Sequence, residues 1–376
     1  MTGVDRVEFA YLEHLLADIA PLFGLVRTSL GYVLLDQSGC TEMHHRIQNN
    51  DWGKPGVLAR LAQRNDPRRA GAEATLRRIC IDRCMPHRLP RMLKRHFPDG
   101  TSYVNTGHSN FTERVAAALR SLPETRISIL VHDTIPIDFP QFQRPGTPEG
   151  FAAFLQRVGA HADLVICNSD QTRRDLLRHL APKSPQTVVA HLGVPQPQPG
   201  PAPKGAWSGK PYFVTLGTIE PRKNHAFLLD LWSDIPDAHL LICGSRGWNN
   251  EAVFDRLDTK PPRIHELPGL SDAEVFGLLQ NAAGLLFPSL AEGYGLPPIE
   301  AAALGVPVLC NDLEICREVL GDIPIYAPVS DGYLWSTQIN RLVNEQREGR
   351  GRKNAHPAGI KAPDWYAHFK SVLTLI

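Results

Sequence analysis

The stretch that decides the fold runs Glu292-Gly293-Tyr294-Gly295-Leu296-Pro297-Pro298-Ile299-Glu300 and places two carboxylates eight positions apart. Its glycines let the backbone pass close to a ligand, and Pro298 suits the first position of a helix that Gly305 ends. The apolar run before it, residues 284–289, predicts a buried strand. The loop therefore joins the carboxyl end of a parallel strand to a helix N-terminus, where α/β folds bind ligands.

Loop amides and the helix dipole favour a phosphate group at this point. The two carboxylates, with Glu300 expected in the first helical turn, can accept hydrogen bonds from sugar or ribose hydroxyls. An ordinary strand, loop and helix with one surface carboxylate and one dipole-stabilised carboxylate is the plain alternative. We therefore interpret the segment as a site for a sugar nucleotide and look for further support along the chain.

The segment resembles the E-x7-E motif of retaining GT-B glycosyltransferases of family 4, the glycosyl transferases group 1 family. The resemblance implies an α/β fold of two Rossmann-like domains that face a central cleft. Glu292 would then bind hydroxyls of the donor sugar, and Glu300 would hold the ribose of the nucleotide. The loop positions expected to bind the donor, mainly through their amides, are Gly293, Tyr294, Gly295 and Leu296.

A second stretch, residues 214–225, again predicts a strand, a turn and a helix. Arg222 and Lys223 fall in the turn, where fixed cations can stabilise the charge that develops on a leaving diphosphate. In isolation, a solvated basic turn would be the default reading. The run resembles the donor-phosphate loop of the family, with Lys223 on its phosphate-binding lysine. It departs from many members at Thr218, where an arginine is usual, and we expect Arg222 to compensate.

His132 and Asp133 follow a predicted strand that begins near Ile127. A residue at the carboxyl end of a parallel strand faces the ligand cleft, although a lone histidine is more often structural. The resemblance implies that His132 contacts the transferred sugar. It also implies that Asp133 holds the local geometry or helps to receive the acceptor.

Two further strand ends resemble the family. Ser169 follows the apolar run 164–167 and is a natural helix N-cap, with capping alone and direct ligand contact equally open. Gly244 lies in a glycine-rich stretch, residues 243–248, that resembles the turn bordering the nucleotide, with a simple turn as the alternative.

The proline-rich segment 195–203 predicts an extended connector between two domains. We expect an acceptor-side domain over residues 1–198, a nucleotide-sugar-binding domain over residues 199–355, and a terminal helix over residues 356–376 that packs back on the first domain. Alternating strands and helices after the connector indicate a parallel sheet. The strands predicted before it span residues 32–35, 127–131 and 164–167, while residues 41–100 are harder to assign.

The first residues, Thr2 to Val7, resemble the T-G-I-x-R loop of the family, in which a glycine, here Gly3, points at the donor. That loop normally follows the first strand of the N-terminal sheet, and almost nothing precedes it here. Either the true start lies upstream or the domain lacks its opening strand. We expect low stability or activity, because a lost parallel strand exposes backbone hydrogen-bonding groups.

Composition fits a folded protein of two domains: the 376 residues are 43% hydrophobic and 21% charged. A net charge of +1 gives no reason to expect nucleic acid binding. No apolar run of spanning length and no leader pattern is seen, which predicts a cytoplasmic location.

The seven cysteines are scattered. Cys80 and Cys84 are expected on one helix face, without a second pair at zinc-like spacing, so we expect buried thiols rather than a metal.

Residues 60–96 contain eleven lysines and arginines but only three acidic residues. Such a stretch can hold a protein on anionic lipid, with about 1 kcal/mol from each nearby cation. The interleaved apolar residues from Leu76 to Cys80 predict an amphipathic helix. Peripheral contact with the inner face of a membrane through residues 60–96 would suit an enzyme that extends a lipid-linked glycan. A solvated helical face, or one that binds an anionic acceptor, fits equally well.

The residues and the resemblance together predict retaining, metal-independent glycosyl transfer without a cofactor, with His132, Glu292 and Lys223 as catalytic residues. The resemblance implies front-face substitution, and the sequence has neither an evident covalent nucleophile nor an Asp-x-Asp metal motif. Residues 217–224 and 244–248 resemble the forms found in family members that assemble bacterial surface polysaccharides and use GDP-mannose. The resemblance therefore implies GDP-mannose as donor, with another hexose or deoxyhexose as the alternative, and a glycan or lipid-linked oligosaccharide as acceptor. A GT-B sugar-nucleotide epimerase and a truncated, inactive protein that binds a glycan or partner enzyme are the alternatives.

Overall fold

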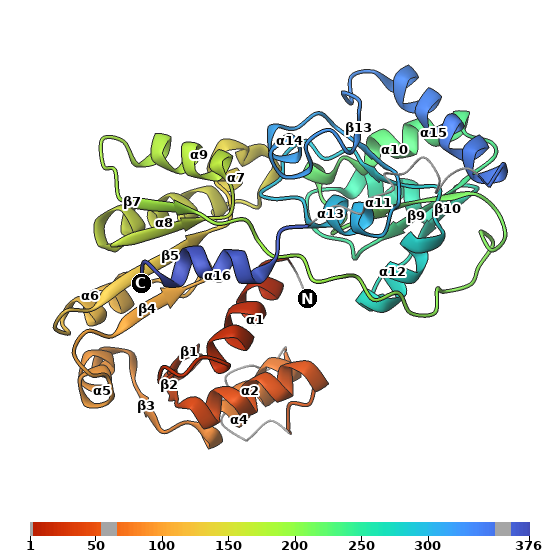
Figure 1. Cartoon of the computed structure of the whole chain (residues 1–376). Helices are drawn as coiled ribbons and strands as arrows, with labels where there is room; N and C mark the ends of the chain where they lie inside the picture. The colour runs from red at the N-terminus through yellow and green to blue at the C-terminus, as the bar shows by residue number, and fades with distance from the viewer. Residues whose placement is uncertain (1–2, 54–65, 350–361) are drawn as a thin grey trace.

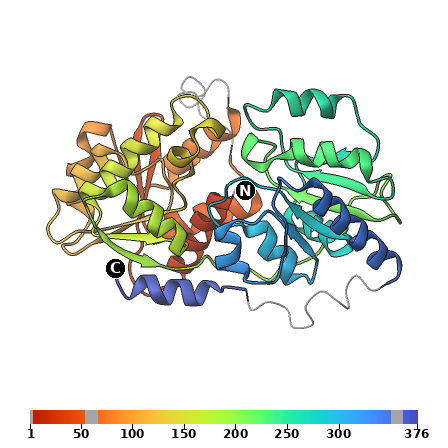
Figure 2. The same cartoon turned by 90° about the horizontal axis from the view of Figure 1, so that it is seen from above.

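The computed structural model describes residues 3–53, 66–349 and 362–376. Its elements form two α/β halves that lie side by side, and the terminal helix lies along the first half (Figures 1 and 2). Within the described residues, no helix combines the length and the apolar character needed to cross a bilayer.

The first half is built on a four-stranded parallel sheet in the order β4-β5-β6-β7. All of β6 and all of β5 after Arg126 are buried, which is typical of parallel strands covered on both faces. The strands are β4 (Ser102–Asn105), β5 (Arg126–Val131), β6 (Leu164–Cys167) and β7 (Gln186–Val189). The helices of this half are α5 (Leu89–His96), α6 (Glu113–Arg120), α7 (Ile135–Asp138), α8 (Thr147–His161) and α9 (Asp170–Leu180).

A small antiparallel sheet, in the order β1-β2-β3, accompanies the parallel one. Its strands are β1 (Gly24–Thr28), β2 (Gly31–Leu35) and β3 (Asp82–Cys84), flanked by α1 (Gly3–Leu16), α2 (Gln37–Asn49) and α4 (Pro67–Ile79). The predicted strand 32–35 exists, but it belongs to this sheet because the turn before Gly31 folds it back on β1. The prediction that Cys80 and Cys84 share a helix face is wrong, since α4 ends at Ile79 and Cys84 lies on β3.

The chain start forms a helix rather than the expected loop. α1 begins at Gly3, and its side chains at Val7 and Tyr11 repeat at helical spacing and are buried. The Tyr11 hydroxyl lies 2.7 Å from Nε2 of His368, on the terminal helix. This contact and the apolar stripe explain why the segment is helical. Among the described residues, the parallel sheet of this half takes its strands from residues 102–189.

The second half is a six-stranded parallel sheet in the order β10-β9-β8-β11-β12-β13. The sequence predicts strands at residues 212–216, 240–243, 285–287 and 306–310, and all four are confirmed, although the last begins at residue 308. The strands are β8 (Tyr212–Leu216), β9 (His239–Cys243), β10 (Ile264–Glu266), β11 (Gly284–Phe287), β12 (Val308–Cys310) and β13 (Ile325–Tyr326). The helices are α10 (His225–Leu231), α11 (Glu251–Asp258), α12 (Asp272–Asn281), α13 (Leu296–Ala303), α14 (Glu314–Leu320) and α15 (Gly332–Arg347). The expected capping box at Ser271 opens α12.

The last helix, α16 (Trp365–Leu373), crosses back to the first half and lies beside α1 (Figure 1). Just before it, the carbonyl of Pro363 accepts a hydrogen bond from the backbone N–H of Val194, the residue before the connector. The return of the terminal helix is therefore as expected. The domain boundaries near residues 198 and 355 stay predictions, and residue 355 lies outside the described residues.

Candidate active site

The loop between β11 and α13 carries the two carboxylates. Gly295 adopts φ +91° and directly precedes the helix, which begins at Leu296 with a proline in its first turn. Pro298 is therefore not the first helical position, and Glu300 lies in the second turn rather than the first, because the helix starts two residues earlier than expected. Gly305, at φ +69°, ends the helix as predicted.

Glu292 lies in a buried ion-pair cluster with the turn after β8. Its Oε1 accepts a hydrogen bond from Nζ of Lys223 at 2.6 Å, and its Oε2 lies 2.7 Å from Nη1 of Arg222. Arg222 also pairs with the buried Glu220 at 2.6 Å. Burial alone would raise the pKa of Glu292, but Arg222 and Lys223 lower it to about 2. Glu292 is therefore ionised and neutralises the cations predicted to face a diphosphate.

His132 follows β5 and is buried. Its Nε2 lies 2.7 Å from the carbonyl of Thr106, to which it donates, and burial lowers its pKa. The ring of His108 lies 5.1 Å from that of His132, and Nε2 of His108 accepts the backbone N–H of His132. The structure therefore holds a neutral, oriented imidazole at the strand end. His108 went unnoticed in the sequence, although its place after the neighbouring strand, β4, was an available signal.

Residues 288–295, between β11 and α13, are here called the donor loop because they are predicted to bind the donor. Asp133 packs against this loop from the opposite domain. A Cβ atom on Gly293 would lie 2.7 Å from Oδ2 of Asp133 and 3.1 Å from the carbonyl of His132, so only glycine permits this approach. Burial raises the pKa of Asp133 to about 6, although Arg222 opposes the shift. The structure therefore brings together His132, Asp133, Arg222, Lys223, Glu292 and Gly293.

Glu300 lies on α13 and is paired with the first domain. Nη1 of Arg6, on α1, lies 2.5 Å from its Oε1, and the same guanidinium reaches Asp272 at 2.7 Å. Burial raises the pKa of Glu300. Arg6 lowers the pKa by a smaller amount, so the net shift is upward. A Cβ on Gly3 would make ordinary contact with Leu296 at 3.7 Å, so α1 lies against α13. Arg6 carried no assigned role in the sequence.

Residues 201–354 match the glycosyl transferases group 1 family. The match lies in the C-terminal half of the chain, which carries Lys223, Glu292 and Glu300. The chain is 32% identical over 214 residues to the serotype-specific mannosyltransferase WbdA of Escherichia coli, a match that covers 50% of this chain and 26% of the relative. It is 33% identical over 138 residues to the O-antigen chain mannosyltransferase RfbU of Salmonella typhimurium, covering 35% of this chain and 38% of the relative. These matches therefore span between a quarter and two fifths of the relatives' length.

Solved structures show the fold. Anabaena Alr3699/HepE in complex with UDP-glucose superposes with a TM-score of 0.61 at 15% identity, covering 81% of this chain and 83% of that one. TarM superposes with a TM-score of 0.60 at 14% identity, and the match covers 80% of this chain and 60% of TarM. The chain therefore has the GT-B architecture of two Rossmann-like domains, as the sequence predicts.

Three further residues predicted to bind a ligand make defined contacts within the protein itself. The hydroxyl of Tyr294 donates to the carbonyl of Leu192 and the ring is buried, so only the backbone of Tyr294 is available to a donor. Ser169 accepts the backbone N–H of Thr172 as the N-cap of α9 and is buried. A Cβ on Gly244 would lie 1.9 Å from the carbonyl of Gly217, so this glycine lets two strand ends pack.

A pocket opens between the two domains beside the ion-pair cluster. Its first-domain wall includes Asp133, Asp138 and Gln171, and its second-domain wall includes Glu292 and Glu314. Carboxylates and amides suit sugar hydroxyls. Among the described residues, no group of three or more histidine, cysteine or acidic side chains is placed to hold a metal ion.

Proposed function

We propose that this chain transfers a mannosyl group from GDP-mannose to a glycan or lipid-linked acceptor, with retention of anomeric configuration. The observation that carries the proposal is the buried Glu292, ion-paired to Lys223 and Arg222 and set against His132 and Asp133 of the other domain. The names of the relatives, mannosyltransferases of O-antigen chains, support mannose and polysaccharide synthesis.

In this proposal, the cations serve the leaving group. Lys223 and Arg222 are ion-paired with Glu292 in the structure. When the donor binds, its diphosphate would replace Glu292 as the partner of these cations in part of the contacts. The freed carboxylate oxygens of Glu292 then accept hydrogen bonds from the sugar. Preorganised charges of this kind stabilise a developing anion without reorganisation at the moment of reaction. Glu300 binds the ribose after Arg6 yields one of its contacts.

The transfer step is a front-face substitution. The bond between the anomeric carbon and the phosphate oxygen breaks while the acceptor oxygen bonds to the same face of that carbon. The departing phosphate oxygen takes the acceptor proton, so the step uses no metal and no protein nucleophile. His132, fixed by the carbonyl of Thr106, orients the sugar, and Asp133 lies at the wall of the pocket proposed for the acceptor.

Membrane contact through residues 60–96 at the cytoplasmic face stays part of the proposal. Residues 60–65 lie outside the described residues. In the remainder, Arg88, Arg91 and Lys94 are exposed on or next to α5, and Ile81 and Met85 are exposed apolar side chains in the same segment. Exposed cations beside exposed apolar groups are suited to anionic lipid.

The experiment is to mix the chain with GDP-mannose and a lipid-linked glycan acceptor and to identify the product by NMR. An α-mannoside formed from the α-configured donor supports the proposal. Release of free mannose alone, a β-mannoside, or reaction only with another nucleotide sugar would contradict it.

A further inference from the structure

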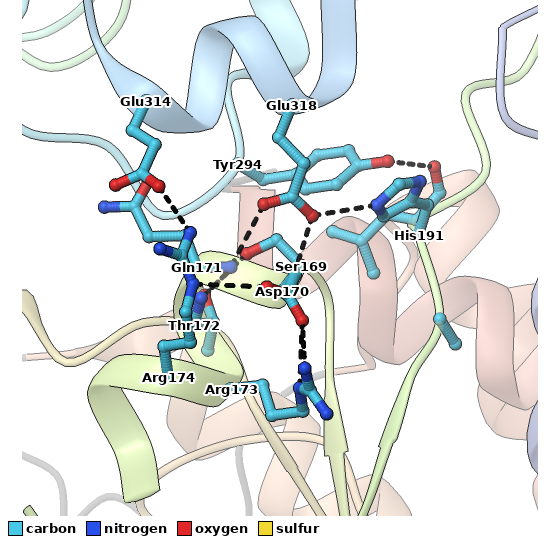
Figure 3. A network of polar contacts seen from close by, with 12 residues as sticks. Ser169, Asp170, Gln171, Thr172, Arg173, Arg174, His191, Tyr294, Glu314 and Glu318 are labelled. Atoms are coloured by element: carbon cyan, nitrogen blue, oxygen red, sulfur yellow. Dashed lines mark hydrogen bonds and ion pairs between the residues drawn. The ribbon is translucent and has the colours of Figure 1, made fainter. Parts of the chain in front are cut away.

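A carboxylate of the C-terminal domain binds the N-terminus of a first-domain helix (Figure 3). Glu318, on α14, accepts the backbone N–H of Asp170 at 2.6 Å through Oε1 and that of Gln171 at 3.0 Å through Oε2. These are two first-turn amides of α9, which have no partner within the helix itself. Ser169 satisfies the next amide, that of Thr172. The first turn of α9 is therefore completed by a residue 148 positions further along the chain.

The charge of Glu318 is well stabilised. Burial alone would raise its pKa, but hydrogen bonds from His191 and from the amides of Asp170 and Gln171 outweigh burial and lower it. Nε2 of His191, which lies between β7 and the connector, is 3.1 Å from Oε1. Hydrogen bonds to an ionised acceptor are about twice as strong as neutral ones. The ionised Glu318 therefore makes strong hydrogen bonds between the two domains.

The first turn of α9 in turn holds the strand end that carries His132. Nδ2 of the buried Asn168 donates to the backbone carbonyl of His132 at 2.8 Å, and the hydroxyl of Thr172 lies 3.4 Å from the same oxygen. That carbonyl packs against Gly293 of the donor loop. A shift of this turn therefore moves His132 relative to the loop.

His191, the hydrogen-bond partner of Glu318, also contacts the donor loop. The rings of His191 and Tyr294 lie 6.2 Å apart, and the hydroxyl of Tyr294 donates to the carbonyl of Leu192. Tyr294 is itself part of the donor loop. Glu318 thus contacts both the helix turn that supports His132 and the segment after β7 that supports the donor loop.

We propose that Glu318 is a positioning residue for sugar transfer. Its carboxylate fixes the first turn of α9 against the C-terminal domain, so that His132 and Asp133 meet the donor loop in the productive arrangement. This inference rests on the proposed function. It assigns Glu318 an effect on the transfer step and not on donor binding, because none of its contacts is with the residues proposed to bind the donor phosphates.

The test compares Glu318→Ala and Glu318→Gln with wild type and with Asp322→Asn, an exposed acid just beyond α14. Loss of two hydrogen bonds to a charged acceptor predicts a fall in kcat of about tenfold or more in Glu318→Ala, with donor affinity changed less than about twofold. Glu318→Gln retains one acceptor oxygen and is expected to recover part of the rate. It also keeps the test open if the alanine variant does not fold. Asp322→Asn is expected to match wild type.

Hydrogen exchange at the amides of residues 170–171 gives a second readout that needs no activity. It should rise about tenfold or more in Glu318→Ala and stay unchanged in Asp322→Asn. An unchanged kcat, or an equal fall in kcat and donor affinity, in an otherwise active protein overturns the inference and leaves the proposed function standing. A wild type that binds no nucleotide sugar overturns the proposed function, and unchanged exchange then overturns the positioning contact as well.

Discussion

Gly293 and Asp133 touch across the domain boundary: a Cβ on Gly293 would lie 2.7 Å from Oδ2 of Asp133. The residue before Gly293 is the ion-paired Glu292, so this contact sets how closely the first domain approaches the donor loop. A Cβ on Gly293 would also lie 3.0 Å from Cβ of Asp133 and 3.1 Å from the backbone carbonyl of His132, so a methyl group there forces its neighbours to shift.

Gly293→Ala is therefore expected to push the two domains apart and to lower kcat by roughly 10- to 100-fold, the cost of overpacking a tight contact. Gly150→Ala is the matched control, because Gly150 lies in α8 with open space around it. Steady-state kinetics on both variants checks the prediction. Equal rates in the two variants would show that the contact has no role in transfer.

Lys223→Met removes the cation that lies 2.6 Å from Glu292. We expect kcat to fall by about 100-fold or more, since the leaving diphosphate loses a preorganised charge. Lys260→Met, at an exposed position after α11, should leave kcat unchanged. A loss of donor affinity with kcat retained would mean that Lys223 only binds the ground state.

The buried carboxyl of Asp133 makes the stability of the protein depend on pH. Its pKa is raised to about 6 in the folded state, so the folded state holds this proton more tightly than the unfolded chain does. The resulting penalty is absent below the unfolded pKa near 4 and grows as the pH rises to 6. Asp133→Asn should remove it and gain roughly 1 to 3 kcal/mol of stability above pH 6 relative to wild type.

Urea unfolding of wild type and Asp133→Asn at pH 4, 5, 6 and 7 measures this difference. Taking the difference at each pH cancels the titration of His108 and His132, whose lowered pKa values act in the opposite direction over the same range. A difference in free energy of unfolding that stays constant with pH would contradict the account of Asp133.

Arg6 and Glu300 join α1 to α13. Arg6→Met leaves the buried Glu300 without this partner, so we expect a loss of about 1 to 3 kcal/mol in stability. If Glu300 binds the ribose, GDP should raise the melting temperature of the variant more than that of wild type. Arg347→Met, which breaks an exposed pair with Asp237, should change neither quantity. Equal GDP-induced shifts in Arg6→Met and wild type would argue against Glu300 as the ribose site.

Charge reversal at Arg88, Arg91 and Lys94 tests the membrane surface. With about 1 kcal/mol from each cation, the triple glutamate variant should bind anionic vesicles about 100-fold more weakly. Reversal at Lys260, Arg341 and Arg347, on the other domain, is the control. Vesicle sedimentation with and without anionic lipid measures both, and equal binding by the two variants would remove this surface from the proposal.

The second domain could be predicted closely from the sequence because its signals are local. Apolar runs such as residues 212–216 are bounded by turn residues, and each run proved to be a strand of the parallel sheet. Residues 41–100 gave no such signal. The strand at 32–35 looks the same in sequence whether it joins a parallel or an antiparallel sheet, and the turn at Gly31 decides the outcome.

The parts of the site that were missed depend on contacts between distant residues. Glu318 meets Asp170, and Arg6 meets Glu300 across 294 positions, with no spacing rule to connect them. Tyr294 is predicted to bind the donor through its backbone amide, and the place of its side chain could not be read from the sequence. The side chain joins the core, since a buried tyrosine finds a partner for its hydroxyl, here the carbonyl of Leu192.

Calorimetric titration of wild type and Glu292→Gln with GDP and GDP-mannose tests the central claim most directly. The account predicts that wild type binds GDP-mannose more tightly than GDP, because Glu292 holds the sugar. In Glu292→Gln this preference should vanish while GDP still binds, since Lys223 and Arg222 remain. Failure of wild type to bind either ligand, or an unchanged preference in Glu292→Gln, would contradict the claim.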